Sequence, residues 1–307
     1  KGKSNKIEAK VYYSVSSKTE KEDNSTVSVD YAKQLVDEYP ESPIFRLVYA
    51  MMLQERTRVD ESITQVNKAL ETNNRSLQNE MKKGGNALLG NAYFKKNDFA
   101  SAIRVIEEHL RYVNDEDRYN ISLYTLGLCY ELTGNRNKAL EFYSKTRTKF
   151  NEERDGELEK YAYRMSRERI NSALRDIDSM IITANNLRDA GSFDESVKTF
   201  EKLLGSTYAG KFNNDDDKAS LYSGAAHSYL MKKDLQKAIE YFEKTIMLNP
   251  KKEVWHIPHS YFELGKIYYR KGDKKKADDY FEKIYDYSDY DSKIFLEMRL
   301  ANFKAKN

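Results

Sequence analysis

The sequence has little that would break, cross-link or embed a helical chain. Four Pro and 13 Gly among 307 residues favour long helices joined by short turns. The single cysteine, Cys129, excludes an internal disulfide and a zinc cage built from cysteines, and it is interpreted as a small buried residue. No run of 18 apolar residues occurs, so no membrane insertion is expected.

Neither sign of charge dominates. The chain has 52 basic and 49 acidic residues, closely interspersed. Nucleic-acid binding normally needs a basic face, and only short Lys clusters occur, at 251–252 and 274–276. They are interpreted as solvated helix faces, so no nucleic-acid partner is expected. With 39% hydrophobic residues, the composition suits a thin core of stacked two-helix layers.

One spacing recurs three times along the chain. Each copy has Leu-Gly followed by Tyr three residues after the Gly, then a turn signal, and then Ala 12 residues after the Gly. A large residue follows four positions after the Ala. The copies place Gly at Gly90, Gly127 and Gly265, Ala at Ala102, Ala139 and Ala277, and the large residue at Ile106, Tyr143 and Phe281.

This spacing has a packing reason in a pair of helices. Gly within a helix costs about 1 kcal/mol relative to Ala, so its recurrence at one register calls for a compensating contact. Without a side chain, the Gly lets the second helix approach closely, and the Ala does the same from the other side. Large residues then fill the remaining space, and the 24 Tyr are interpreted mainly as core residues of this kind.

The pattern resembles the tetratricopeptide repeat, a helix hairpin with a period of about 34 residues. Weaker copies fit the same frame, which implies about seven repeats, several of them degenerate. The small residue of each second helix falls at Ala32, Ser62, Ala102, Ala139, Ser196, Ala238 and Ala277. The resemblance implies an all-α fold, a right-handed superhelical solenoid of helix hairpins.

The spacing of the repeats also divides the chain. The widest interval separates Ala139 from Ser196, and no Pro or Gly interrupts the sequence between Gly156 and Arg188. We predict N-terminal repeats over 5–154, an extra or long linking helix over 155–182, C-terminal repeats over 183–288 and a capping helix over 289–307. The first helix of the first repeat would cover about Ile7–Ser17.

The capping helix is predicted from its amphipathic pattern. Ile294, Phe295, Met298 and Ala301 fall on one face, with charged residues elsewhere. A solenoid needs such a helix to cover its last apolar layer.

The resemblance also implies where a partner binds. In this family the first helices line a concave groove that holds extended or helical peptides, and apolar residues in such a groove favour a protein ligand. The alternative is that some of these side chains pack against a neighbouring helix. The groove positions are Asn91, Phe94, Lys95, Tyr124, Leu128, Glu131, Asn185, Arg188, His227, Leu230, Met231, His259, Phe262, Lys266, Tyr269 and Arg270.

The run Gly90–Lys95 is similar to the first repeat of the chaperone-tail-binding subtype, which clamps a C-terminal carboxylate. Asn91 matches the Asn of that subtype. The clamp Lys three residues before the Gly is replaced by Ala87, and the Asn of the following repeat by Thr125. The clamp is incomplete, so chaperone-tail binding is disfavoured.

Catalytic and metal-binding motifs are weak. His256 and His259 are separated by Pro258 and have no third ligand at a recognisable spacing. The run Asn213–Asp217 lacks the alternating ligands and the distal Glu of a calcium loop. It is interpreted as a solvated loop that ends in helix N-cap residues. We therefore expect no cofactor, no metal and no catalytic residue.

These observations predict a monomeric, non-catalytic scaffold that binds a partner protein or peptide in its groove. Two alternatives stay open: a regulatory domain of a larger enzyme, and a cargo-binding domain of a cell-envelope protein. Lys1 rather than Met begins the sequence, and the second alternative implies an upstream signal or anchor. The compartment would be the cytoplasm or a bacterial cell envelope.

Overall fold

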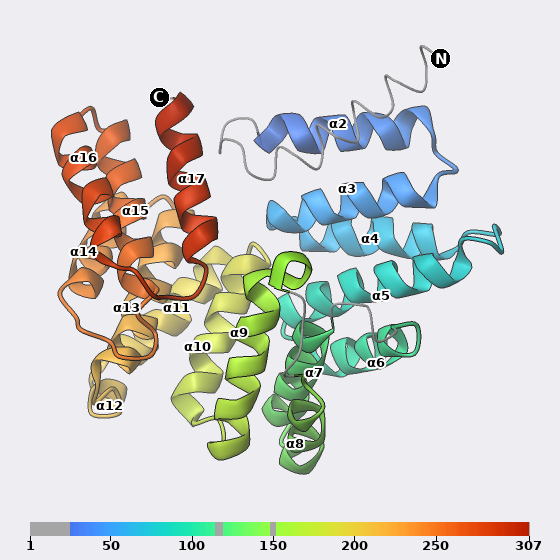
Figure 1. Ribbon diagram of the computed structural model, residues 1–307, viewed down its shortest axis with the longest axis horizontal. Helices are drawn as coiled ribbons and strands as arrows, with labels where there is room; N and C mark the ends of the chain where they lie inside the picture. Colours follow the sequence, from blue (N-terminus) through green and yellow to red (C-terminus); the bar gives the residue numbers. More distant parts are fainter. Residues whose placement is uncertain (1–24, 114–118, 148–151, 307) are drawn as a thin grey trace. The chain divides into compact units, whose positions relative to one another are not determined.

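A computed structural model of the chain describes residues 25–113, 119–147 and 152–306. These residues form sixteen α-helices and one short 3-10 helix, with no strand among them (Figure 1). The predicted all-α repeat fold is therefore confirmed. The helix predicted over Ile7–Ser17 lies outside the described residues.

The chain forms two compact units. The first extends to Leu174 and includes residues 189–191, and the second comprises residues 175–188 and 192–305. The segment 155–182, predicted as an extra or long linking helix, contains the end of one helix and the start of another. The break between these helices coincides with the boundary between the units.

The first unit is a stack of helix hairpins (Figure 1). Helix α2 packs on the hairpin α3–α4, which is followed by the hairpins α5–α6 and α7–α8. Helix α9 packs against both α7 and α8, in the position that the first helix of a further hairpin would take. The bounds are α2 Ser25–Glu38, α3 Pro43–Glu55, α4 Val59–Leu70, α5 Gln78–Lys95, α6 Phe99–Leu110, α7 Asn120–Leu132, α8 Arg136–Ser144 and α9 Glu152–Asn171.

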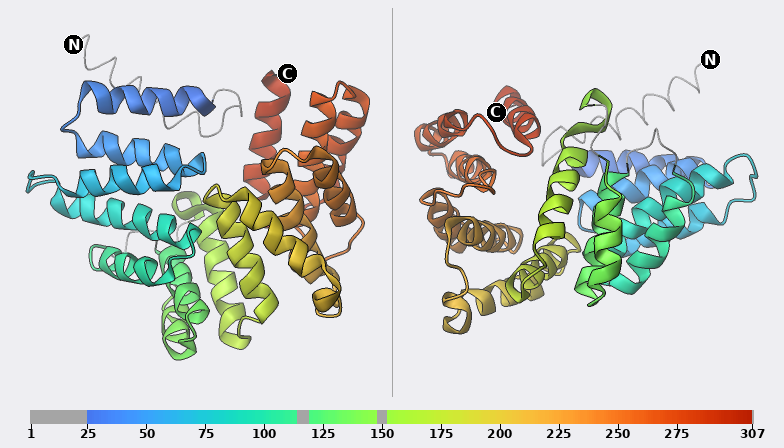
Figure 2. Two further views of the ribbon diagram at one scale, coloured as in Figure 1. Left: turned by 180° about the vertical axis from the view of Figure 1, so that it is seen from behind. Right: turned by 60° about the horizontal axis from the view of Figure 1, so that its bottom comes forward.

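The second unit repeats this arrangement with three hairpins, α10–α11, α13–α14 and α15–α16, followed by helix α17 (Figure 2). A continuous apolar core joins the three hairpins. The bounds are α10 Asp176–Asp189, α11 Phe193–Leu204, α12 Ser206–Ala209, α13 Asp215–Met231, α14 Leu235–Ile246, α15 His256–Arg270, α16 Lys274–Lys283, the 3-10 helix η2 Ile284–Asp286, and α17 Lys293–Lys306.

The recurring Gly has the packing role that the sequence predicts. A Cβ added to Gly127 would lie 2.3 Å from Cε1 of Tyr143, and one added to Gly265 would lie 2.3 Å from Cε1 of Phe281. Both aromatic rings are buried. Any larger residue at these positions would therefore separate the paired helices.

The turn within each hairpin contains one residue with a positive φ, as at Gly134 and Lys233. In four of the six described hairpins the side chain of the next residue caps the second helix, whereas Arg58 and Ser192 make no such bond. Asn135 accepts a hydrogen bond from the backbone N–H of Lys138 at 3.2 Å, and Asp234 accepts one from Lys237 at 3.1 Å. Such caps satisfy N–H groups that the first turn of a helix leaves without partners.

Some Tyr residues also join neighbouring hairpins through their hydroxyl groups. Tyr130 stacks on Phe142 of its own hairpin at 5.5 Å between ring centroids, and its hydroxyl donates to Glu107 of the preceding hairpin at 2.6 Å. Tyr229 repeats this pattern: its ring stacks on Tyr241 at 5.7 Å and its hydroxyl donates to Glu201 at 2.9 Å. Each unit therefore has a polar bond between hairpins at the same register.

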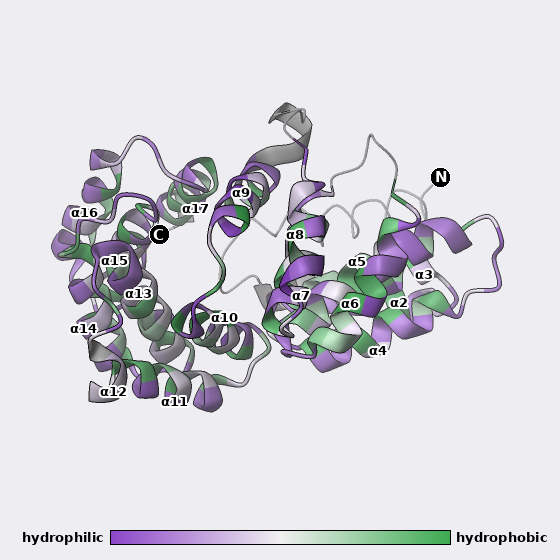
Figure 3. Cartoon of the chain, turned by 90° about the horizontal axis from the view of Figure 1, so that it is seen from below, coloured by the Kyte–Doolittle hydropathy of each residue, from purple (hydrophilic) through white to green (hydrophobic). Residues whose placement is uncertain are grey.

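The helices have narrow apolar faces, as expected for thin layers. Figure 3 shows hydrophobic and hydrophilic residues alternating around the helices of each unit. Within the described residues, no helix is both long and apolar enough to span a membrane.

The predicted apolar face of the capping helix is wrong. Ile294, Phe295 and Met298 are 62%, 49% and 45% exposed, whereas Leu296 and Leu300 are fully buried. Residues four and three apart share a face of a helix, so the inward face of α17 is Leu296, Leu300 and Phe303. The capping role of α17 survives with this different face.

Candidate functional site

The first helix of each hairpin presents two positions side by side: the residue after the small position, and the residue one turn later. We call the surface that these positions form the first-helix face of each unit. In the first unit, Asn91 Nδ2 of α5 donates to Gln54 Oε1 of α3 at 2.9 Å. Gln54 occupies the later position on α3, and Asn91 occupies the earlier position on α5. These two positions therefore contact each other between neighbouring hairpins.

The predicted groove residues on α5 remain accessible. Asn91 is exposed, and Phe94 and Lys95 are half-buried. The ring of Phe94 lies 5.9 Å from that of Phe99. These three residues form the accessible part of the first-helix face in the first unit.

On α7, the expectation of a groove contact is wrong for Tyr124 and Leu128. Both side chains are buried, and the ring of Tyr161 from α9 lies edge-on to Tyr124 at 6.2 Å. Helix α9 occupies the place of a following first helix and covers these positions. A partner could reach them only by displacing α9.

Glu131 serves the fold rather than a partner. Its side chain is 5% exposed. It accepts hydrogen bonds from Arg136 at 2.7 Å, from the Tyr143 hydroxyl at 2.8 Å and from the backbone N–H of Leu174 at 2.9 Å. The carboxylate therefore ties α7 to α8 and to the end of the first unit. Its expected accessibility is also wrong.

On α15, the same correction applies to Phe262 and Lys266, which are 2% and 3% exposed. Phe262 packs with Leu296 and Leu300 of α17. Tyr269 is half-buried, with its ring 5.3 Å from that of Phe303. Helix α17 therefore covers on α15 the positions that α9 covers on α7.

A buried ion cluster lies beneath α17. Lys266 Nζ is 2.8 Å from a carboxylate oxygen of Glu263, and Arg299 of α17 is 3.4 Å from the other. Burial would raise the pKa of Glu263, but the charges of Lys266 and Arg299 outweigh it and hold that pKa at about 2. Neither Glu263 nor Arg299 stood out in the sequence, because they are far apart along the chain.

Two histidines lie beside this cluster on the first-helix face. The ring of His227 packs edge-on against Phe242 at 5.0 Å, and that of His259 packs edge-on against Trp255 at 5.4 Å. Burial lowers the pKa of His227 to about 3 and that of His259 to about 4. Among the described residues, His259 Nε2 is buried without a hydrogen-bond partner. Both imidazoles are therefore neutral near pH 7.

The remaining predicted residues of the second unit are accessible. Asn185 and Arg188 are half-buried and joined by a hydrogen bond of 2.8 Å. Leu230 is half-buried, and Met231 and Arg270 are exposed. The first-helix face of the second unit thus keeps accessible residues on α10, α13 and α15.

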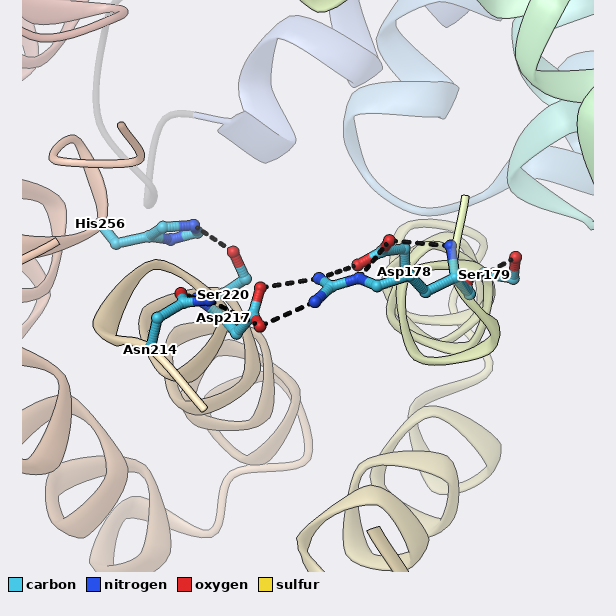
Figure 4. A network of polar contacts seen from close by, with 7 residues as sticks. Asp178, Ser179, Asn214, Asp217, Ser220 and His256 are labelled. Atoms are coloured by element: carbon cyan, nitrogen blue, oxygen red, sulfur yellow. Dashed lines mark hydrogen bonds and ion pairs between the residues drawn. The ribbon is translucent and has the colours of Figure 1, made fainter. Parts of the chain in front are cut away.

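His256 has a structural environment. Its Nδ1 atom lies 2.6 Å from the Ser223 hydroxyl. Its Nε2 atom lies 3.1 Å from the Ser220 hydroxyl, as Figure 4 shows. Both ring nitrogens are thus engaged by α13. No cluster of three His, Cys, Asp or Glu side chains that could hold a metal occurs within the described part of the chain.

The acidic run at the start of α13 binds neighbouring segments of the second unit. Asn214 caps α13, accepting from the backbone N–H of Asp217 at 2.8 Å, as the sequence predicts. Asp217 and Asp178 bind the same guanidinium, that of Arg175 (Figure 4). Asp216 accepts from three consecutive backbone N–H groups, at residues 251–253. The expected solvated loop is therefore wrong for Asp216 and Asp217.

Stacked hairpins with a recurring Gly, capped turns and terminal covering helices define a helical-repeat protein. Family models described as tetratricopeptide repeat match residues 219–252 and 258–289, and another matches residues 88–152. The chain therefore contains tetratricopeptide repeats in these segments, as its sequence predicted. No curated protein matches the sequence.

Several solved structures are similar to the chain at low identity. A tetratricopeptide repeat protein from Parabacteroides merdae is 15% identical, with 97% of this chain and 98% of that chain covered and a TM-score of 0.37. PilF of Pseudomonas aeruginosa is 13% identical, with 84% and 98% covered and a TM-score of 0.39. YrrB, described as having an unusual peptide-binding site, is 18% identical, with 75% and 96% covered and a TM-score of 0.32.

Proposed function

We propose that the chain is a non-catalytic scaffold that binds a segment of a partner protein on the first-helix face of its second unit. The observation that carries the proposal is the distribution of accessible residues. In the first unit, Tyr124, Leu128 and Glu131 are covered or bonded internally, and only α5 presents predicted contacts. In the second unit, predicted contacts remain accessible on three successive first helices.

The composition of this face suits a protein ligand. Met231 and Leu230 offer apolar contact, and Arg188 and Arg270 add charged donors. Exposed apolar side chains surrounded by polar groups are typical of protein contact surfaces. The same surface would serve if the chain belonged to a larger enzyme or an envelope protein.

The reactive side chains support a non-catalytic role. Burial raises the pKa of the Cys129 thiol to about 12, which keeps the thiol protonated and weakly nucleophilic. His256 is engaged through both ring nitrogens by Ser220 and Ser223. These groups stabilise the fold where a catalytic base or nucleophile would need access to a substrate.

The test uses two exposed methionines of the second unit. Met231, 41% exposed, lies on the first-helix face, and Met247, 84% exposed, follows the second helix α14. A partner captured by crosslinking from the source organism is purified, and its affinity for each variant is measured by calorimetry. Met231→Glu should weaken binding more than about tenfold, a loss typical of an interface anchor. Met247→Glu should bind like the wild type.

The opposite pattern of affinities would show that the partner does not bind on the first-helix face. Loss of affinity in Met247→Glu with full binding by Met231→Glu would place the partner on the second-helix side. Melting temperatures of both variants serve as the folding control.

A further inference from the structure

Helix α17 has apolar side chains on two opposite sides. Its inner side packs on α15 and α16 through Leu296 and Leu300, which are fully buried. On the outer side, Ile294 and Met298 are 62% and 45% exposed. A helix that covers one core normally has polar residues facing the solvent, and a helix that is apolar on both sides is normally buried on both. The outer side of α17 therefore calls for a second contact.

The outer apolar residues have the spacing of a coiled coil. Ile294, Met298, Ala301 and Ala305 are separated by four, three and four positions, and all four are exposed. Residues at this spacing form one continuous stripe, the arrangement through which two helices pack along each other. We call these four residues the outer stripe of α17. Phe295, 49% exposed, lies at its edge.

The outer stripe has large residues in its N-terminal half and small residues in its C-terminal half. In an antiparallel pair of α17 helices, Met298 can face Ala301 of a second copy, and Ile294 can face Ala305. Each large side chain then meets a small one, which lets the helices approach closely. A parallel pair would instead bring Ala305 against Ala305 and leave space there. The stripe is therefore complementary to itself when the two helices are antiparallel.

The charges beside the stripe fit the same pairing. Glu297 and Lys304 lie seven residues apart, on one edge of the stripe. In the antiparallel pair, Glu297 of each copy comes beside Lys304 of the other. Within the chain, Glu297 is 39% exposed and 3.8 Å from Lys293, and the exposed Lys304 has its ammonium 5.9 Å from the ring of Phe281. Charged residues at the edges of paired helices determine which helices pair and in which orientation.

We propose that two copies of the chain associate through the outer stripe of α17, with the two helices antiparallel about a two-fold axis. The sequence predicts a monomer, and it also predicts an inward position for Ile294 and Met298, whereas the structure places both residues outward. Two 14-residue helices bury less surface than a standard protein interface, so the dimer should form in the micromolar range. This association is independent of the partner-binding face proposed above.

Sedimentation equilibrium of the full chain, from about 2 to about 200 µM, measures the dimer dissociation constant. We expect a dimer that dissociates on dilution. Met298→Glu should weaken it more than about tenfold, because each copy then has a charge within the stripe. Met247→Glu, at a Met of the same unit that is 84% exposed, is the matched control and should leave the constant unchanged. Melting temperatures of both variants serve as the folding control.

A charge exchange tests the antiparallel arrangement. Glu297→Lys leaves only Lys at the two edge positions, and Lys304→Glu leaves only Glu. Each variant alone should therefore dimerise more weakly than the wild type, by about threefold or more. Mixed in equal amounts, the two variants should form a heterodimer of about wild-type strength, because every Lys again lies beside a Glu.

Two results would overturn the proposal: a chain that stays monomeric at about 200 µM, or a dimer that Met298→Glu leaves unchanged. A mixture of the two charge variants that associates no more tightly than either variant alone would exclude the antiparallel pairing.

Discussion

Both units end their stack of hairpins with a single helix, α9 in the first unit and α17 in the second. Each helix covers the same two positions of the preceding first helix, Tyr124 and Leu128 on α7 and Phe262 and Lys266 on α15. In the first unit the covered pair is an aromatic and an aliphatic residue. In the second unit a Lys takes the aliphatic position and needs Glu263 and Arg299 around it.

This difference shows that the repeat pattern determines which positions are buried, but not which residue types occupy those positions. An apolar residue at the covered position is stabilised by removal from water alone. A Lys there is tolerable only with a paired carboxylate, and the pair then brings further charges close to the first-helix face. The second unit therefore has buried ion pairs at these covered positions, where the first unit has Tyr124 and Leu128.

The largest expected effect comes from breaking the ion cluster of the second unit. Glu263→Ala leaves Lys266 buried beside Arg299 without its carboxylate, which should cost about 3–5 kcal/mol of unfolding free energy. The single Trp, Trp255, lies in the second unit, so its fluorescence during urea unfolding reports this loss.

A double variant sharpens the comparison. Glu263→Leu with Lys266→Leu gives the second unit the apolar chemistry of Leu128, and it should recover most of the stability. A double variant as unstable as Glu263→Ala would show that the ion cluster is needed for more than charge balance.

Lowering the pH should reduce the unfolding free energy of the second unit, because two buried neutral histidines become protonated when it unfolds. Burial holds the pKa of His227 at about 3 and of His259 at about 4, below the unfolded value of about 6.5. A neutral buried imidazole contributes stability that is complete above the unfolded pKa and is lost as the pH falls below it. Each histidine should cost at most about 1.4 kcal/mol per pH unit between about pH 6.5 and the folded pKa.

Trp255 fluorescence at a series of pH values measures this slope. In His227→Gln the slope should decrease, while a slope that is flat in the wild type would contradict the burial of the two rings. Glu263 does not interfere above about pH 4.5, because its folded pKa is near 2 and it stays ionised.

Overpacking the contact between α7 and α8 should lower the stability of the first unit by an intermediate amount and leave the second unit unchanged. In Gly127→Leu the new side chain would meet the Tyr143 ring, and Ala139→Leu would overfill the same contact from the other helix. Each should cost about 1–3 kcal/mol. Amide hydrogen exchange should rise in α7 and α8, with Trp255 fluorescence of the second unit as the control. Unchanged exchange in both variants would contradict the close approach of these helices.

The smallest expected loss of stability comes from removing the Tyr hydroxyl bonds that occur at the same register in both units. Tyr130→Phe and Tyr229→Phe each remove one hydroxyl bond to a Glu of the preceding hairpin and keep the stacked ring. Each should cost about 0.5–1.5 kcal/mol in its own unit. A much larger loss in one unit, seen by hydrogen exchange, would show that this bond has different roles in the two units.

The fold was largely predictable because its signals are local. Leu-Gly followed by Tyr, and the Ala that comes 12 residues after the Gly, specify one hairpin without reference to distant residues. The covering helices were predicted less well. The apolar stripe at Ile294 and Met298 was a plausible inward face, but Leu296 and Leu300 fit the contact with Phe262 better.

The candidate site was harder to predict because exposure depends on contacts between distant segments. Phe262 and Leu128 occupy groove positions in the repeat frame, yet α17 and α9 bury them. Glu131 is bonded to Leu174, and Glu263 to Arg299, by contacts that no short pattern contains. Met231 and Arg188 remain accessible, so they stay predictions that binding experiments can test.

The most direct test of binding on the second unit places a photo-crosslinking amino acid at one position at a time. It replaces Met231 on the first-helix face of the second unit, Phe94 on that of the first unit, or Met247 outside both. After irradiation with the partner, the account predicts a strong covalent adduct from position 231 and none from position 247. An adduct from position 94 or 247, with none from position 231, would contradict it.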